Sequence, residues 1–267
     1  MGLKSRESSN LSLGTRKEIS RGFGSPRGVY PAPNLFWCGA RRLICIGFWG
    51  QKRIGGFAFW GKKIFNSMKK RIYIAHGWDG YPEEGWFPWL KKELEAKGFD
   101  IYVPQLPEAG SPRIQNWVPK LAEVVGTADE NTYFVGHSMG CQTIARYLES
   151  LPEEVMVGGA VFVAGFFKRL TGLEDDPDVQ ETDKHWLGTP LDLTKVKSHL
   201  PKSVAIFSDN DPYVPLDNQD DFRDKLGSKI IIEHKKGHFS GGSDGVTELP
   251  IVLQSILKLA QYKYGNF

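Results

Sequence analysis

The chain contains, in this order, a serine, an aspartate and a histidine that could act together as nucleophile, orienting acid and base. Ser138 lies in the run T-Y-F-V-G-H-S-M-G-C-Q-T-I-A-R-Y at 132–147, where an apolar strand leads into a glycine-flanked turn and then a helix. Glycines two positions before and after the serine allow a sharp turn that lifts the hydroxyl above the sheet edge. The pattern predicts that Ser138 is an attacking alcohol.

A second match to the same G-x-S-x-G pattern serves as an internal control. It lies at 241–245, and no apolar strand precedes it. Its crowding of glycine, serine and aspartate is typical of a loop. We therefore interpret residues 136–140 as the catalytic turn and residues 241–245 as a loop.

The predicted acid and base follow two further strands. The run at 204–215 carries Asp209 and Asp211 just after an apolar strand, and the run at 229–239 ends in a loop with His238. A serine hydroxyl needs a base within hydrogen-bond reach and a carboxylate that orients the base. The order Ser138, Asp211, His238 is the order of α/β-type hydrolases.

Asp211 is favoured over Asp209 because Pro212 stiffens the chain directly after it and Val214 can anchor the loop. Asp209 is expected to bond the backbone of its own turn, as Asx residues do. The alternative is that both aspartates only form turns and neither takes part in catalysis.

Among the six histidines, His238 is predicted to be the base because it follows a strand in third place. His234 is interpreted as a structural or surface residue. His137 is expected to point away from the site, because Ser138 must point into it. His76 ends the first strand and is expected to shape the oxyanion loop.

Two backbone amides are predicted to stabilise an oxyanion. One is the amide of Met139, directly after the nucleophile at the start of the following helix. The other is assigned to Trp78, within the glycine-bracketed turn H-G-W-D-G at 76–80.

The part of the chain from residue 71 to residue 267 resembles the small α/β-hydrolase-like serine hydrolases related to retinoblastoma-binding protein 9 and its bacterial YdeN-type relatives. The motifs that carry the resemblance are I-Y-I-A-H-G-W at 72–78, W-F-P-W-L at 86–90, V-P-Q-L-P at 103–107, F-V-G-H-S-M-G at 134–140, S-D-N-D-P-Y-V-P at 208–215 and G-H-F at 237–239. The resemblance implies a compact, metal-free hydrolase without a cofactor, with Ser138, Asp211 and His238 as its triad. Cys141 departs mildly from many members and is expected to pack against the sheet as a small apolar group.

Charge divides the chain into two parts. Residues 1–67 contain 12 Lys and Arg against 2 Asp and Glu, a net charge of +10, whereas residues 68–267 contain 22 against 29, a net charge of −7. The acidic balance of the second part excludes nucleic acid as an expected partner. Nothing in the sequence identifies a protein partner.

Residues 1–67 are predicted to be a disordered or non-native upstream extension, and residues 68–267 to be the catalytic domain. The first part is rich in glycine, arginine and aromatic residues without helical or strand spacing. No run is long enough to cross a membrane, since the uncharged stretch at 155–167 has only 13 residues. With Cys141 as the single cysteine of the catalytic part, neither a disulfide framework nor a metal cluster is expected, and a reducing cytoplasm is the predicted location.

Alternating apolar strands and amphipathic helices predict an α/β fold: a three-layer αβα sandwich with a mostly parallel sheet and a minimal lid. Strands are predicted at 71–76, 100–104, 131–136, 157–164, 203–208 and 229–234, and helices at 86–97, 113–125, 139–150, 216–226 and 247–262. The short lid is predicted at 166–200, where Trp186 and Phe166 are expected to wall an acyl or leaving-group pocket. The acidic run at 174–178 is interpreted as solvated surface.

The predicted function is hydrolysis of a small carboxylic ester, amide or aminoacyl ester through an acyl-serine intermediate. The alternative is a protein-interaction module that keeps the hydrolase fold with slow or vestigial catalysis. Acyl transfer to an acceptor other than water would use the same residues.

Overall fold

The structure of the protein is a computed structural model, in which residues 69–173 and 177–261 are described. The predicted extension at 1–67 and residues 174–176 of the acidic run lie outside the described residues.

The described chain forms a six-stranded sheet in which every neighbouring pair of strands is parallel. Its strands are β1 (Arg71–Ala75), β2 (Asp100–Tyr102), β3 (Thr132–His137), β4 (Gly159–Val163), β5 (Ser203–Ser208) and β6 (Lys229–Glu233). They lie side by side in the order β2-β1-β3-β4-β5-β6. The predicted parallel sheet is confirmed.

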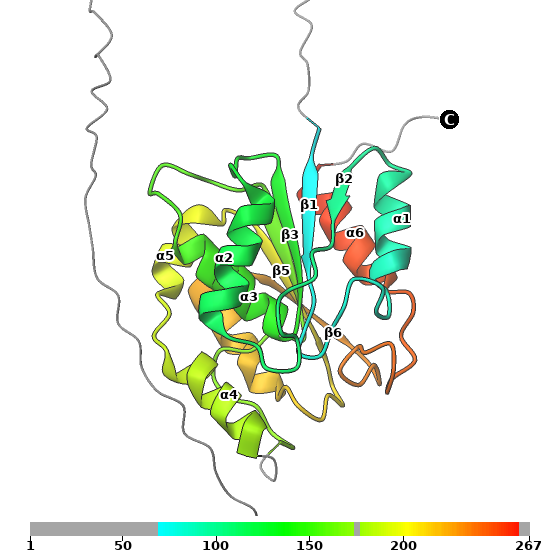
Figure 1. Cartoon of the computed structure of the whole chain (residues 1–267). Helices are drawn as coiled ribbons and strands as arrows, with labels where there is room; N and C mark the ends of the chain where they lie inside the picture. Colours follow the sequence, from blue (N-terminus) through cyan, green and yellow to red (C-terminus); the bar gives the residue numbers. More distant parts are fainter. Residues whose placement is uncertain (1–68, 174–176, 262–267) are drawn as a thin grey trace, which may run out of the picture. The chain divides into compact units, whose positions relative to one another are not determined.

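Helices cover both faces of this sheet (Figure 1). One face carries α1 (Phe87–Glu95) and α6 (Pro250–Leu259), whose buried side chains join one apolar cluster. The other carries α2 (Ile114–Val125), α3 (Met139–Glu149) and α5 (Leu193–His199), whose buried side chains join a second cluster. The predicted three-layer αβα sandwich is therefore confirmed.

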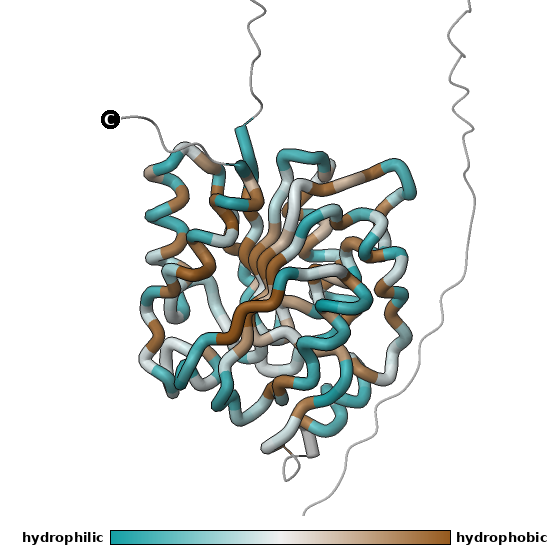
Figure 2. Tube along the Cα trace, turned by 180° about the vertical axis from the view of Figure 1, so that it is seen from behind, coloured by the Kyte–Doolittle hydropathy of each residue, from teal (hydrophilic) through white to brown (hydrophobic). Residues whose placement is uncertain are grey.

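The burial of the strands explains their composition. Every residue of β3, β4 and β5 is buried, as expected for central strands of a sheet covered on both faces. The edge strand β6 is partly exposed throughout. Figure 2 shows the hydrophobic residues concentrated along the sheet and the hydrophilic ones on the surrounding loops and outer helix faces.

Two segments differ from the prediction. The segment at 166–200 contains α4 (Pro177–Gly188) and α5, neither of which was predicted. The helix predicted at 216–226 is instead a 3₁₀ turn (Leu216–Asn218) followed by a π-helical segment (Asp221–Leu226). In the described ranges, no helix combines the length and apolar character that crossing a membrane requires.

Because the strands are parallel, their carboxyl ends meet at one edge of the sheet. The chain leaves β3 at Ser138, β5 into the loop with Asp211, and β6 into the loop with His238. The fold therefore brings residues that are far apart in sequence to the same edge.

Candidate active site at the carboxyl ends of the strands

Ser138 occupies the turn between β3 and α3 in a conformation that side chains rarely adopt, with φ of 51° and ψ of −119°. The flanking glycines are required by close packing. A Cβ atom on Gly140 would lie 2.2 Å from the carbonyl oxygen of Ala75, and one on Gly136 would lie 2.9 Å from a backbone nitrogen of α3. The turn thus holds the hydroxyl in place by packing β1 directly against the start of α3.

Asp211 and His238 are joined by a hydrogen bond across two loops. The Nδ1 atom of His238 lies 2.9 Å from Oδ2 and 3.1 Å from Oδ1 of Asp211, whose side chain is 2% exposed. Oδ1 also accepts hydrogen bonds from the amides of Tyr213 and Val214, at 2.8 and 3.0 Å. A carboxylate held in this way keeps the proton on Nδ1 and leaves Nε2 as the acceptor.

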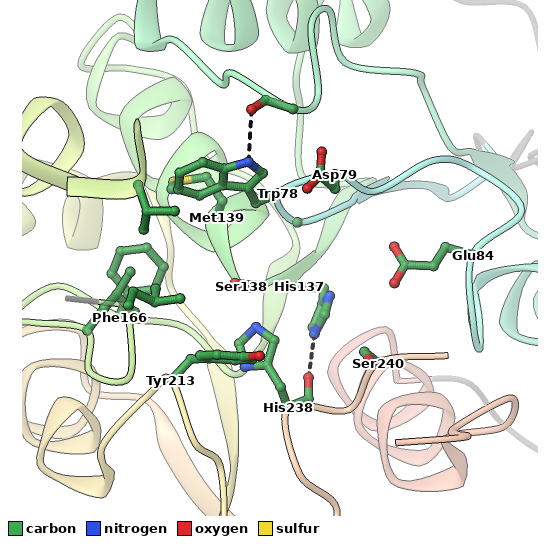
Figure 3. Close-up of a pocket in the computed structure, with 15 residues that line it drawn as sticks. Trp78, Asp79, Glu84, His137, Ser138, Met139, Phe166, Tyr213, His238 and Ser240 are labelled. Atoms are coloured by element: carbon green, nitrogen blue, oxygen red, sulfur yellow. Dashed lines mark hydrogen bonds between the residues drawn. The ribbon is translucent and has the colours of Figure 1, made fainter. Parts of the chain in front are cut away.

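Ser138 and His238 line the same cavity of about 450 Å³. Figure 3 shows the imidazole beside the serine, with the ring of Tyr213 next to it. The Tyr213 ring packs edge-on against the His238 ring, with centroids 5.2 Å apart. Among the described residues no hydrogen bond joins the Ser138 hydroxyl to His238, a contact that often tightens only when substrate binds.

Two side chains that the sequence analysis missed hold the His238 loop. Asn210 accepts a hydrogen bond from the amide of Gly237 at 2.9 Å. Asp244 accepts one from the amide of His238 at 2.8 Å and one from the amide of Ser240 at 2.9 Å. The position of Asn210 directly before the predicted acid was the only local signal of this role.

Asp209 was predicted to bond the backbone of its own turn, but its main partners lie outside that turn. Its carboxylate accepts a hydrogen bond from the amide of Lys235 at 2.8 Å and pairs with the exposed ring of His234 at 2.6 Å. The Lys235 amide and then His234 lower the pKa of Asp209. Asp209 therefore ties the ends of β5 and β6 together, and His234 is a surface residue.

The expectation that His137 points away from the site is wrong. His137 lines the cavity beside Ser138, although only 4% of its surface is exposed, and its ring lies 5.0 Å from that of His238. Its Nε2 atom donates a hydrogen bond of 2.7 Å to the carbonyl oxygen of His238 (Figure 3). Burial, and then the proximity of His238, lowers the pKa of His137 to about 3, so the ring is neutral.

The two amides predicted to form an oxyanion hole border the same space. Trp78 and Met139 both line the cavity, and the Met139 amide is in the first turn of α3, where it has no partner within the helix. His76 shapes the adjacent turn: its Nδ1 donates to the Gly77 carbonyl at 2.8 Å, and its Nε2 accepts from the Leu106 amide at 3.0 Å. Burial lowers the pKa of His76 and keeps it neutral.

Of the two predicted pocket residues, the structure places only Phe166 in the cavity, beside Leu170. The prediction for Trp186 is wrong. Its side chain, on α4, is fully buried, packs against Trp117 with the ring centroids 5.9 Å apart, and donates its indole N–H to the Pro112 carbonyl at 2.9 Å. Trp186, on a helix that was not predicted, is therefore a core residue and not a wall of the cavity.

Within the described ranges, no group of three or more histidine, cysteine, aspartate or glutamate side chains could hold a metal ion. Cys141 is fully buried in the apolar cluster beneath α3, as predicted, and burial raises the pKa of its thiol.

Comparison with known proteins identifies the family of the chain. The serine hydrolase family model matches residues 72–258. A hydrolase of Bacillus subtilis (strain 168), YdeN, is 35% identical over 185 residues, which cover 69% of this chain and 93% of YdeN. Serine hydrolase RBBP9 of Rattus norvegicus is 27% identical over 172 residues, covering 64% and 87% of the two chains. The chain belongs to the serine hydrolase family, and the predicted resemblance is confirmed.

Solved structures give the same assignment of fold. The crystal structure of the ydeN gene product from B. subtilis matches with a TM-score of 0.66 and 32% identity, covering 72% of this chain and all of that one. Est1E from Butyrivibrio proteoclasticus matches with a TM-score of 0.56 and 16% identity, covering 72% and 89%. The fold is that of the α/β-hydrolases, and the chain is a hydrolase.

Proposed function

We propose that the protein cleaves small carboxylic esters through a covalent acyl intermediate on Ser138, with His238 as general base and Asp211 as the orienting acid. The observation that carries this proposal is the Asp211–His238 hydrogen bond of 2.9 Å at a cavity that also contains Ser138 on a strained turn. A surface histidine would not require a buried carboxylate fixed by two amides.

The proposed reaction follows from the tautomer of His238. Its Nε2 takes the proton of Ser138 as the hydroxyl oxygen attacks the ester carbonyl, and Asp211 stabilises the imidazolium that forms. Nε2 then gives the proton to the departing alcohol. In the second half, the same nitrogen takes a proton from the water that attacks the acyl-serine, and returns it to the Ser138 oxygen as the bond to the acyl carbon breaks and the acid leaves.

The oxyanion of each tetrahedral intermediate is assigned to the amides of Trp78 and Met139. The Met139 amide follows the nucleophile directly at the start of α3, where the helix dipole favours negative charge. The Trp78 amide belongs to the turn that His76 shapes, and Trp78 lines the same cavity as Met139. Two preformed donors of this kind need no rearrangement as the charge develops.

The experiment is steady-state hydrolysis of p-nitrophenyl esters of increasing acyl length by the wild type, Ser138→Ala and Ser243→Ala. Removing Ser138 should lower kcat by about 10⁴-fold or more, whereas Ser243→Ala should leave it unchanged. Ser243 is a matched control because it occupies the same place in the second G-x-S-x-G segment. Equal loss in both variants, or a folded wild type that cleaves no ester, would contradict the proposal and favour a binding role for the fold.

A further inference from the structure

Strand β6 forms an open edge of the sheet. In the described part of the chain it pairs with β5 on one side and with no strand on the other. Figure 2 shows this edge from behind, as a hydrophobic stretch with hydrophilic ends in front of the other strands. Its sequence is K-I-I-I-E, and Ile232 is 40% exposed. An apolar edge strand of this kind is a template for pairing with a further strand.

The backbone of β6 turns alternate residues outward. The carbonyl oxygen of Glu233 accepts a hydrogen bond of 3.2 Å from the amide of Asp209, which directly follows β5. Because backbone groups alternate along a strand, Glu233 and Ile231 turn theirs toward β5, whereas Ile230 and Ile232 turn theirs away from the sheet. Among the described residues, the outward N–H and C=O groups of these two isoleucines have no backbone partner.

The side chains of β6 divide between the two faces of the strand. Ile230 packs against the apolar cluster of α2, α3 and α5, whereas Ile231 packs against the cluster of α1 and α6. Lys229 and Glu233 lie on the same face as Ile231, because side chains alternate along a strand. Within the described ranges neither of these two charged side chains forms a salt bridge. The strand thus carries one charge of each sign at its two ends, with three isoleucines between them.

We propose that β6 is a dimer interface, at which a second copy of this chain adds its own β6 in antiparallel orientation centred on Ile231. In this register Lys229 lies opposite Glu233 of the second copy at both ends, and Ile230 lies opposite Ile232. The outward backbone groups of Ile230 and Ile232 then face each other as hydrogen-bonded pairs. The charged residues form the non-hydrogen-bonded pairs, in which side chains are closer together. Sliding one strand by two residues would lose both ion pairs, so the charges fix the register.

Antiparallel pairing also makes the contact two-fold symmetric, so that it closes after two copies. Parallel pairing in register would instead place Lys229 beside Lys229 and Glu233 beside Glu233. No residue of β6 lines the cavity, so the contact does not depend on the proposed ester hydrolysis. A strand of five residues buries a small area, and we expect a weak dimer with a Kd of about 1–100 μM.

Sedimentation velocity of the full chain over a range of concentrations measures this Kd. Lys229→Glu and Glu233→Lys should each weaken the dimer about tenfold or more, because like charges then face each other at both ends. Mixing the two variants should restore a dimer, since one chain then carries two glutamates and the other two lysines at the paired positions. Lys92→Glu is the matched control, the same change of charge at an exposed position of α1, which packs beside the opposite edge strand β2. It should leave the Kd unchanged.

Circular dichroism checks that each variant is folded. A wild type that stays monomeric up to about 500 μM would overturn the proposal. A dimer that survives both charge reversals would place the interface elsewhere on the molecule. Weakened variants that do not recover on mixing would overturn the antiparallel register.

Discussion

Two segments of the molecule share the pattern G-x-S-x-G and use it in opposite ways. At 136–140 an added Cβ would meet the backbone of α3 from Gly136 and the backbone of β1 from Gly140, and the serine lies on a strained turn between a buried strand and a helix. At 241–245 the segment is a loop: an added Cβ on Gly245 would meet no atom within 4 Å, whereas one on Gly241 would lie 2.4 Å from the Cα of Gly85 in another turn. The loop contributes through Asp244 instead, which binds the amide of His238.

The difference shows that packing, rather than the order of residue types, makes a serine a candidate nucleophile. Gly140 allows β1 to touch the first turn of α3, which brings the amides of the helix start to Ser138. In the second segment the close contact is between Gly241 and Gly85 of another turn, not between a strand and a helix start, and the segment positions the proposed base through Asp244. One segment would thus supply the reacting atom, and the other would hold its partner.

The largest effect concerns activity and should distinguish the two aspartates that bind His238, since Asp211 binds its ring and Asp244 binds its amide. Asp211→Asn is expected to lower kcat/KM for a p-nitrophenyl ester by about 10⁴-fold, because the ring loses the partner that fixes its tautomer. Asp244→Asn should cost at most about tenfold, since asparagine keeps an oxygen acceptor for the His238 amide. Steady-state kinetics on both variants measures this, with circular dichroism as the folding control. Similar losses in the two variants would contradict the assigned roles.

The next effect concerns stability and compares a packed glycine of the first segment with an open glycine of the second. Gly140→Ala should lower the free energy of unfolding by about 3 kcal/mol, because the new methyl group meets the backbone of Ala75. Gly242→Ala should stay within about 0.5 kcal/mol of the wild type, because the site is open and its φ is not positive. Urea denaturation measures both. A tolerated Gly140→Ala would mean that the turn is not held by this contact.

Local patterns in the sequence predicted the sheet, its parallel strands and most of the helices, because buried β-branched runs and helical spacing are local properties. The same kind of signal selected Asp211 and His238, which the structure joins by a hydrogen bond, and Ser138, which lies at the same cavity. All three directly follow or lie just beyond strands, so a parallel sheet necessarily gathers them.

The remaining features depend on contacts between distant segments, which no local pattern encodes. Trp186 was predicted as a pocket wall because the helix that carries it and turns it into the core was not foreseen. His137 was predicted to point away from the site because its neighbour Ser138 points into it. This alternation of side chains along a strand stops applying at a sharp turn. Asp244 carried no sequence signal, since its role exists only where its loop meets the site.

A smaller effect follows from the titration of His137, whose position in the second G-x-S-x-G segment is occupied by Gly242. Its pKa of about 3 lies below the unfolded value near 6.5, so below about pH 6.5 the unfolded chain binds a proton that the native ring refuses. Stability is therefore full above pH 6.5 and falls as the pH drops, by about 1.5 kcal/mol between pH 6.5 and pH 5 from this residue. His76, whose pKa is also lowered, acts in the same direction.

Urea denaturation at several pH values measures this slope. His137→Gln keeps a donor for the His238 carbonyl but does not titrate, so its stability should fall less steeply with acid than that of the wild type. Equal slopes for the two proteins would show that His137 is protonated in the native state.

The smallest effect is expected from removing residues 1–67. The family match begins at residue 72, and both G-x-S-x-G segments lie beyond it. A protein of residues 68–267 should keep its ester kinetics and its urea midpoint. Insolubility or lost activity of this shorter chain would show that residues 1–67 contribute to the folded enzyme.

The central claim, that packing activates Ser138 and not Ser243, is tested most directly by labelling with a fluorophosphonate followed by peptide mass mapping. This reagent forms a covalent adduct only with an activated serine. The account predicts one adduct, on the peptide that contains Ser138, and its loss in His238→Ala. An adduct on Ser243, or no adduct on the folded protein, would contradict it.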